Sequence, residues 1–211
     1  MPAKQMFLML TAMVCGLATA WAETPAGWHT YDSPEYGFMI AYPGTFALTH
    51  TLNNIAVPLR DADERLDHPG YGCQPASLSC LEYNRPTFNH SGIWEIGVTV
   101  NVLPENATET SCYQIELGDR VADMTRTTRI NGTEFHYGDT SDGWTGHSVK
   151  KSEYHTFHEH VCFEIDLDVA SHDLARDEDD YKPIDQRALR RVLREQERIL
   201  RTFTFVGQSV F

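Results

Sequence analysis

Residues 146–169 read GHSVKKSEYHTFHEHVCFEIDLDV, and this stretch decides the fold more than any other part of the chain. In its second half, large apolar residues take every second position: Val161, Phe163, Ile165 and Leu167. Polar or small residues fill the positions between them: Cys162, Glu164, Asp166 and Asp168. This period of two is typical of a strand with one covered face and one wetter face. We therefore predict long strands over 146–157 and 161–169, joined tightly through residues 158–160.

Further strands are indicated on both sides of this hairpin. Residues 28–31 and 38–42 are predicted as short strands separated by a turn, and 93–102 alternates as clearly as 161–169. Residues 130–137, which contain Asn131-Gly132, are predicted as a strand with a turn or bulge, and 202–205 as a last strand. Residues 51–92 contain four prolines and few periodic positions, so they are interpreted as a long loop insertion.

Two helices are predicted. The first lies within residues 108–124, with Thr108 or Thr110 as its cap, although Gly118 interrupts it. The second follows Pro183, where side chains recur at helical spacing: Leu189, Val192, Leu193, Gln196, Ile199 and Leu200. The sequence therefore predicts the α+β class, a mostly antiparallel sheet with flanking helices and a disulfide-bearing loop insertion.

Composition limits the class of protein. The chain has 211 residues, 41% of them hydrophobic, and its net charge is −13. This is enough apolar material for a packed core, and the length suits a single domain over residues 23–211. Plentiful aromatic residues and ordinary glycine and proline contents exclude a chain-wide disordered, collagen-like or coiled-coil protein. The negative charge argues against nucleic acid as a partner, because phosphate binding needs a basic face.

Residues 1–22 have the features of a signal peptide. Lys4 gives a positive start, residues 6–20 are almost entirely apolar, and Ala20-Trp21-Ala22 fits the small-x-small cleavage rule. The apolar run of about 15 residues is shorter than the roughly 20 that a membrane-spanning helix needs. We expect cleavage after Ala22, a periplasmic or extracellular mature protein, and no transmembrane span within it.

Four cysteines remain after the predicted cleavage site: Cys73, Cys80, Cys112 and Cys162. An even number in an exported chain favours two disulfides, for which three pairings exist. We favour Cys73–Cys80, which closes a small loop, and Cys112–Cys162, which ties two distant segments together. A four-cysteine metal site is the alternative, but zinc sites usually contain cysteines two to four residues apart, and this chain has none.

Three stretches resemble PsbP-like secreted domains, a family named for an extrinsic photosystem II protein. They are YDSPEYGFMIAYP at 31–43, YHTFHEHVCFEI at 154–165 and ILRTFTF at 199–205. The resemblance covers about 35 residues, and its motifs are aromatic packing positions, a proline strand stop and a helix-to-strand joint. It implies an antiparallel sheet flanked by helices, and a binding or assembly role rather than catalysis. The disulfide-bearing insertion departs from the family pattern.

The densest candidate metal ligands are His155, His158 and His160, which lie beside Glu159. Imidazoles with a carboxylate bind zinc, copper or nickel. On a straight strand His155 faces away from the other two, so convergence would require a hairpin turn there. A solvated, histidine-rich turn is the alternative interpretation. No other cofactor is indicated.

Two common motifs for catalysis are missing from the sequence: there is no G-x-S-x-G elbow and no H-E-x-x-H. Acidic residues at 177–180, and the pair Asp166 and Asp168, lack the spacing of a calcium loop. We interpret the run at 177–180 as a charged linker. Enzymatic activity is therefore not expected, although catalytic residues from distant positions can assemble in space.

Charge is distributed unevenly along the chain. Residues 23–182 carry 10 basic and 27 acidic side chains, a net charge of −17, whereas residues 183–211 carry 6 and 3, a net charge of +3. The basic side chains lie on the predicted last helix: Arg187, Arg190, Arg191, Arg194, Arg198 and Arg201. They form either a solvated face with local Arg–Glu pairs or, as the sharper hypothesis, a docking surface for an acidic partner.

The sequence thus favours an exported, non-catalytic binding or assembly domain that contacts a protein or an envelope component, through the first five of these arginines and the loop around Cys73 and Cys80. The alternatives are a periplasmic metal-binding protein that uses residues 155–160, and an exported hydrolase with an unrecognised site.

Overall fold

The computed structural model describes residues 24–51, 77–84, 88, 91–103, 107–117, 120–144, 146–172 and 182–206. Its first elements are β1 Trp28–Ser33, β2 Phe38–Pro43, β3 Phe46–Thr51, β4 Ser79–Tyr83, β5 Ile93–Val102, α2 Glu109–Cys112, β6 Gln114–Leu117 and β7 Arg120–Asp123. The remainder are β8 Arg126–Ile130, β9 Thr133–Trp144, β10 His147–His158, β11 Val161–His172, α3 Gln186–Leu200 and β12 Thr204–Phe205. The predicted signal peptide lies outside the described residues.

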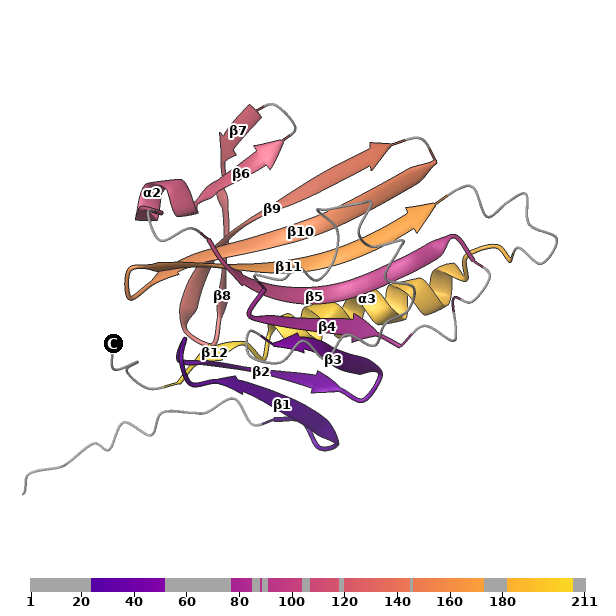
Figure 1. Ribbon diagram of the computed structural model, residues 1–211, viewed down its shortest axis with the longest axis horizontal. Coiled ribbons are helices and arrows are strands. Elements are labelled where there is room, and N and C mark those ends of the chain that lie inside the picture. Colours follow the sequence, from indigo (N-terminus) through magenta and orange to yellow (C-terminus); the bar gives the residue numbers. More distant parts are fainter. Residues whose placement is uncertain are drawn as a thin grey trace, which may run out of the picture.

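A seven-stranded antiparallel sheet forms the body of the protein (Figure 1), in the order β3-β4-β5-β11-β10-β9-β8. A three-stranded sheet, β1-β2-β12, and the small hairpin β6-β7 accompany it. Helix α3 runs along one face of the large sheet, behind β4 and β5 in the view of Figure 1. The two faces of the large sheet therefore have different surroundings.

Two tight turns set the register of the long strands. Glu159 and His160 connect β10 to β11 with positive φ angles of 48° and 68°. Asn131 and Gly132 connect β8 to β9 with φ angles of 47° and 88°. Two-residue loops with left-handed residues match the twist of antiparallel strands. The predicted hairpin at 158–160 is therefore confirmed, and the β10–β11 pairing runs from His158↔Val161 to His147↔His172.

The core lies between the large sheet, α3 and the three-stranded sheet. Phe38 stacks on Phe203 and makes edge contacts with Phe163, and all three are at most 2% exposed. Helix α3 buries four apolar side chains: Ala188, Val192, Ile199 and Leu200. Each large apolar side chain buried in this way stabilises the fold by about 1.5–3 kcal/mol. The strands predicted over 93–102 and 161–169 and the helix predicted after Pro183 are thus confirmed. The wetter face expected of these strands is wrong, because both of their faces are largely buried.

Gln196 is the polar exception in this apolar contact. Its Nε2 atom donates to the carbonyl oxygens of Gly97, at 2.6 Å, and Asp168, at 3.0 Å. The amide satisfies two carbonyl groups of adjacent strands β5 and β11, so it fixes the position of α3 along the sheet.

The predicted α+β class is wrong, because the described chain is dominated by antiparallel strands and contains just one helix longer than a turn. Thr108 does cap a helix, but α2 ends at Cys112, and residues 114–117 and 120–123 pair as the antiparallel strands β6 and β7. In the sequence, Gly118-Asp119 between these two strands is a dipeptide that favours a two-residue hairpin loop over a continuing helix.

Part of the predicted loop insertion is also wrong. Strand β4 lies within residues 51–92 and pairs with both β3 and β5. Its sequence, SCLEY, is buried on both faces and therefore does not alternate, so it lacks the pattern by which a half-exposed strand is recognised. Residues 52–76 lie outside the described residues. In the described part of the chain, no helix has the length and apolar character required to cross a membrane.

Candidate functional site

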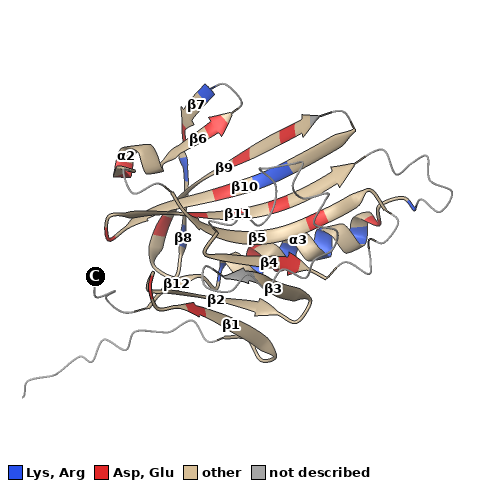
Figure 2. Ribbon diagram, in the orientation of Figure 1, with Lys and Arg blue, Asp and Glu red and all other residues tan. Residues whose placement is uncertain are grey.

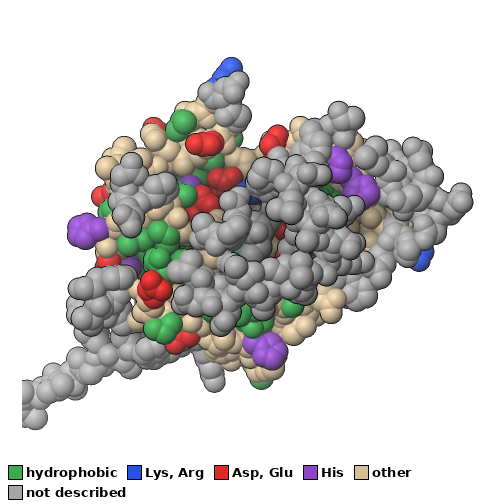
Figure 3. Space-filling view, in the orientation of Figure 1, with side chains coloured by type: hydrophobic (Ala, Val, Ile, Leu, Met, Phe, Trp, Pro, Cys, Tyr) green, Lys and Arg blue, Asp and Glu red, His purple; other side chains and the backbone are tan. Residues whose placement is uncertain are grey.

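The large sheet carries different side chains on its two faces. The inner face packs against α3 and holds the apolar core. The opposite, outer face carries polar side chains that are nevertheless almost completely buried: Glu95, Thr99, His155, Asp166 and Asp168. Acidic side chains gather near the middle of the surface shown in Figure 3. Since buried charges are stable only when they are paired or bind a cation, the outer face is the first candidate site.

A disulfide clamps α2 onto the outer face. Cys112, at the end of α2, is bonded to Cys162 on β11, and the two Cα atoms are 5.6 Å apart. This confirms one of the two predicted pairings, and a buried disulfide fits an oxidising compartment. Cys80 is also disulfide-bonded, but its predicted partner, Cys73, lies outside the described residues, so that pairing stays a prediction.

His155 lies at the centre of the candidate site and is 2% exposed. Its Nδ1 atom is 2.6 Å from the carbonyl oxygen of Cys112. Its Nε2 atom is 3.1 Å from Oε2 of Glu164 and 3.9 Å from Oε2 of Glu153, but makes no hydrogen bond of good geometry with any described residue. Because a carbonyl oxygen only accepts, Nδ1 must carry its proton, and Nε2 is left facing two carboxylates.

Both carboxylates are oriented by neighbouring donors. Thr140 Oγ1 donates to Oε1 of Glu153 at 2.7 Å, and Asn101 Nδ2 donates to Oε1 of Glu164 at 2.9 Å. The second oxygen of each carboxylate is therefore free to face His155. Lys151 adds a positive charge nearby, with Nζ 3.3 Å from Oδ2 of Asp166.

The pKa values on this face reflect competition between burial and charge. Burial lowers the pKa of His155, but the Glu164 carboxylate outweighs it and the net pKa is raised. Burial raises the pKa of Glu164, but His155 and Asn101 outweigh it and the net pKa is lowered. For Asp166, burial and the charge of Glu164 raise the pKa to about 7. The outer face therefore attracts cations.

The structure does not bring the three predicted histidine ligands together. His155 is on the outer face, whereas the ring of His158 stacks on that of Phe205, with centroids 3.8 Å apart. His160 is exposed in the turn. The described residues contain one group with metal-ligand spacing, formed by Glu153, His155 and Glu164, whose ligand atoms lie within 4.8 Å of one another.

Sequence reasoning missed Glu153 and Glu164, although a signal for both was present. Glu153 is two residues before His155, so it shares a face of the strand. The predicted two-strand hairpin also places His155 opposite Glu164 once the turn is centred on residues 159 and 160, as the pairing confirms. The register of the hairpin, rather than closeness in sequence, thus identifies the set.

Helix α3 presents a second candidate surface. We call its five exposed basic residues the arginine stripe: Arg187, Arg190, Arg191, Arg194 and Arg198. Figure 2 shows basic positions along α3. The Arg198 guanidinium lies 4.9 Å from the ring centre of Trp28. Among the described residues, none of the five forms an ion pair within 4.0 Å, and Glu195 instead accepts a hydrogen bond from Thr45.

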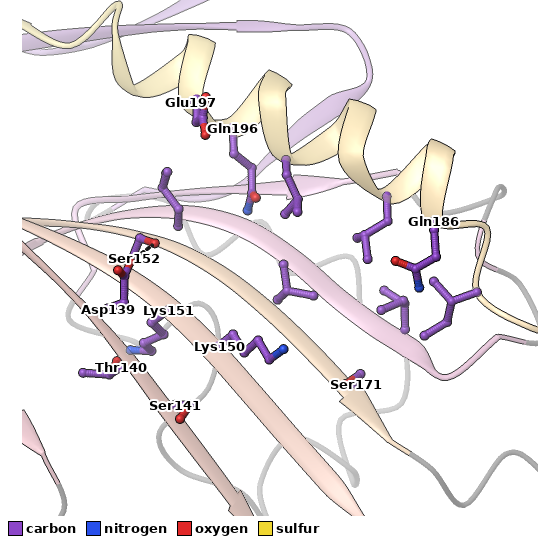
Figure 4. A pocket seen from close by; sticks show the side chains of 16 residues that line it. Asp139, Thr140, Ser141, Lys150, Lys151, Ser152, Ser171, Gln186, Gln196 and Glu197 are labelled. Carbon is purple, nitrogen blue, oxygen red and sulfur yellow. Dashed lines mark hydrogen bonds between the residues drawn. The ribbon is translucent and has the colours of Figure 1, made fainter.

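A groove of 660 Å³ lies between α3 and strands β9–β11 (Figure 4). Six apolar residues line it, Ile93, Leu167, Val169, Ile184, Leu189 and Leu193, and the other ten lining residues are polar or charged. The Lys150 side chain points into the space, and Asp139 is engaged by Ser152 at one end. A volume of this size is typical of a small-molecule site.

These features define a class of protein, a β-rich, disulfide-bonded sheet domain with one covering helix. No protein-family model and no curated protein matches the chain. It is similar to a protein of known crystal structure from Bacteroides thetaiotaomicron VPI-5482, with a TM-score of 0.45 and 9% sequence identity. That similarity covers 86% of this chain and 50% of the other, so this chain spans half the length of its structural neighbour.

Proposed function

We propose that this protein is an exported, non-catalytic binding domain that docks an acidic protein segment along the arginine stripe. The observation that carries the proposal is the exposure of all five arginine residues of the stripe on a protein whose net charge is −13. Export rests on the predicted signal peptide, and the Cys112–Cys162 disulfide supports it. The resemblance to PsbP-like domains agrees with a binding role and stays a prediction.

The dimensions of the stripe favour a protein segment over a membrane. From Arg187 to Arg198 the helix rises about 16 Å, the length of about five residues of extended chain. The apolar side of α3 is buried in the core, so it cannot insert into lipid as an interfacial helix does. A flat anionic surface would also meet the acidic body of the protein, whereas a narrow segment contacts the stripe alone.

The test is binding of a fluorescent poly-glutamate peptide, followed by anisotropy at low and high salt. Replacing Arg190, Arg191 and Arg194 by Glu should weaken binding by at least about tenfold, because each pair contributes a fraction of a kcal/mol and the charge reversal adds repulsion. The matched control reverses three exposed cations elsewhere: Arg120, Arg129 and Lys182. Equal weakening by both triple variants, or binding that does not respond to salt, contradicts the proposal.

The groove favours a second candidate function, the binding of a small amphipathic anion. Its six apolar residues suit a hydrophobic body, and Lys150 supplies a positive charge for an anionic end. Asp139 and Glu197 also line the groove, so the anionic end has to bind Lys150 at a distance from these two carboxylates, a condition that the probe tests. The probe is anilinonaphthalene sulfonate, which has both parts and fluoresces when it leaves water. Leu193→Trp should fill the groove and abolish the signal. Leu117→Ser with Val121→Ser, which removes the exposed apolar residues of β6–β7, should leave it unchanged.

A further inference from the structure

We propose that Glu153, His155 and Glu164 bind one divalent transition-metal ion of the zinc class on the outer face of the large sheet. The ligand atoms are Nε2 of His155 and Oε2 of each glutamate. This site lies on the opposite side of the sheet from α3, so the inference is independent of the arginine stripe and of the groove. It also differs from the histidine set predicted from the sequence, with which it shares His155 alone.

The distances between the ligand atoms are close to those that a metal requires. Zinc lies about 2.0–2.2 Å from nitrogen and oxygen ligands, so ligands in a tetrahedron are about 3.4 Å apart. His155 Nε2 is 3.1 Å from Glu164 Oε2 and 3.9 Å from Glu153 Oε2, and one ligand atom from each of the three residues lies within 4.8 Å of the others. A small rotation of the Glu153 side chain would complete the geometry, with water at the fourth position.

Each of the three proposed ligand side chains is oriented by a hydrogen bond at its other polar atom. The Cys112 carbonyl accepts from Nδ1 of His155, Thr140 donates to Glu153, and Asn101 donates to Glu164. A metal-binding histidine typically donates its second ring N–H to a carbonyl or carboxylate, and metal-binding carboxylates are hydrogen-bonded in turn. All three orienting contacts of such a centre are therefore present.

The buried Nε2 atom of His155, which lacks a hydrogen bond of good geometry, is a second observation besides the cluster of carboxylates. The side chain is 3% exposed, and this atom has no hydrogen-bond partner of good geometry among the described residues. With the proton on Nδ1, its lone pair faces two carboxylates, an arrangement that repels unless a metal ion or a second proton lies between them. Mixed nitrogen and oxygen ligands suit zinc or manganese, whereas calcium and magnesium take oxygen ligands.

Access and competition also fit a metal ion. The side chains of Glu153 and Glu164 are 15% and 17% exposed, so the site is open on their side. The competing occupant is a second proton on His155, which with Lys151 would balance part of the acidic charge. An imidazolium would need no metal, so the experiment has to separate these two states.

The direct test is calorimetric titration of chelator-stripped, disulfide-intact protein with zinc chloride. We expect one site with a dissociation constant in the micromolar range or below. Glu153→Gln and Glu164→Gln keep the size of each side chain and its amide oxygen as an acceptor, and should each weaken zinc binding by about 100-fold. The matched control, His158→Ala with His160→Ala, removes the other histidines of the hairpin and should leave the affinity unchanged.

A second measurement does not depend on variants that perturb the core. In the wild-type protein, zinc should shift the NMR signal of His155 Nε2, whereas Nδ1 stays protonated. Thr140→Val should weaken binding by about 10- to 100-fold through the orientation of Glu153, and Thr140→Ser should restore it. No zinc binding at micromolar concentration, loss of binding in the His158/His160 variant, or an unshifted His155 signal would each overturn the inference.

Discussion

The inner and outer faces of the seven-stranded sheet are both buried, but different interactions stabilise them. On the inner face, Phe163 and Ile165 of β11 pack into an apolar core under α3. On the outer face, Glu164 and Asp166 of the same strand lie among other charged groups, and the Cys112–Cys162 disulfide links α2 to this strand. Burial on the inner face is favourable by itself, whereas burial on the outer face has to be balanced by pairing. Strand β11 thus has an apolar buried face and a charged buried face.

The largest effect is expected from the link that closes the outer face. Replacing Cys112 and Cys162 by Ser removes a cross-link over a sequence separation of 50 residues, which should lower the free energy of unfolding by about 4 kcal/mol in the loop-entropy model. Chemical denaturation of both proteins measures the difference. If α2 contributes nothing to the outer face, zinc affinity will stay unchanged in this variant; we expect it to fall, because Cys112 orients His155.

A smaller loss is expected from a cavity on the inner face. Ile165 is completely buried, so Ile165→Ala should reduce the free energy of unfolding by about 3 kcal/mol, and Ile165→Val by about 1 kcal/mol. Zinc binding on the outer face should not change in the Val variant. Coupling between this cavity and the zinc affinity would show that the two faces are not independent.

The buried carboxyl groups of the outer face should make the free energy of unfolding depend on pH. Burial and the charge of Glu95 raise the pKa of Asp168 well above its ordinary value. A carboxyl with a raised pKa binds more protons in the folded state, so its contribution to stability is fully present below the unfolded pKa and declines as pH rises towards the folded pKa. Asp168→Asn removes this dependence and should raise the free energy of unfolding near pH 7 by about 1–2 kcal/mol.

Asp139 serves as a control, because its pKa is shifted in the opposite direction to that of Asp168. Hydrogen bonds from Arg126 and Ser152 lower its pKa, so its contribution is present above the unfolded pKa and is lost as pH falls. Asp139→Asn should therefore reduce the change in the free energy of unfolding with pH in the acidic range. Asp168→Asn should reduce it in the range approaching neutral pH. Denaturant titrations from pH 3 to pH 8 separate the two. Parallel curves for the Asp168 variant and the wild type would mean that its carboxylate is solvated.

The sequence allowed one face of the fold to be predicted well and the other poorly. Alternation in 161–169 correctly placed Phe163 and Ile165 in the core, because apolar periodicity reports directly on burial. The same alternation predicted a wetter face, yet Asp166 is 3% exposed. Burial of that face depends on covering segments such as α2, whose disulfide partner is 50 residues away along the chain. Strand β4 was missed because burial on both faces removes the alternation on which the prediction relied.

The candidate sites follow the same rule. The exposed arginines of α3 could be predicted, since an amphipathic helix determines which residues face solvent. The partners of His155 required the register of β10 against β11, and the groove required the packing of α3 over the sheet. Neither is encoded within a single segment. His158 attracted the metal hypothesis because it is close in sequence, although strand geometry directs it away from His155.

The smallest effect concerns α2 and tests whether its position is fixed locally or by the disulfide. Thr108 accepts a hydrogen bond from the Ser111 backbone N–H at 3.1 Å, and the Ser111 hydroxyl accepts in return from the Thr108 backbone N–H at 2.8 Å. Thr108→Ala should lower the free energy of unfolding by about 0.5–1 kcal/mol, the low end for a helix cap, because a four-residue helix has few hydrogen bonds to lose.

The informative measurement is the same substitution without the disulfide. If the disulfide holds α2 in place, Thr108→Ala will cost more in the Cys112→Ser, Cys162→Ser background than in the wild type, and the difference is the coupling free energy. Identical costs in both backgrounds would show that the cap acts alone. In that case the cap and the disulfide would not cooperate in positioning α2. The contact between the Cys112 carbonyl and His155 would then be expected to persist when the disulfide is reduced.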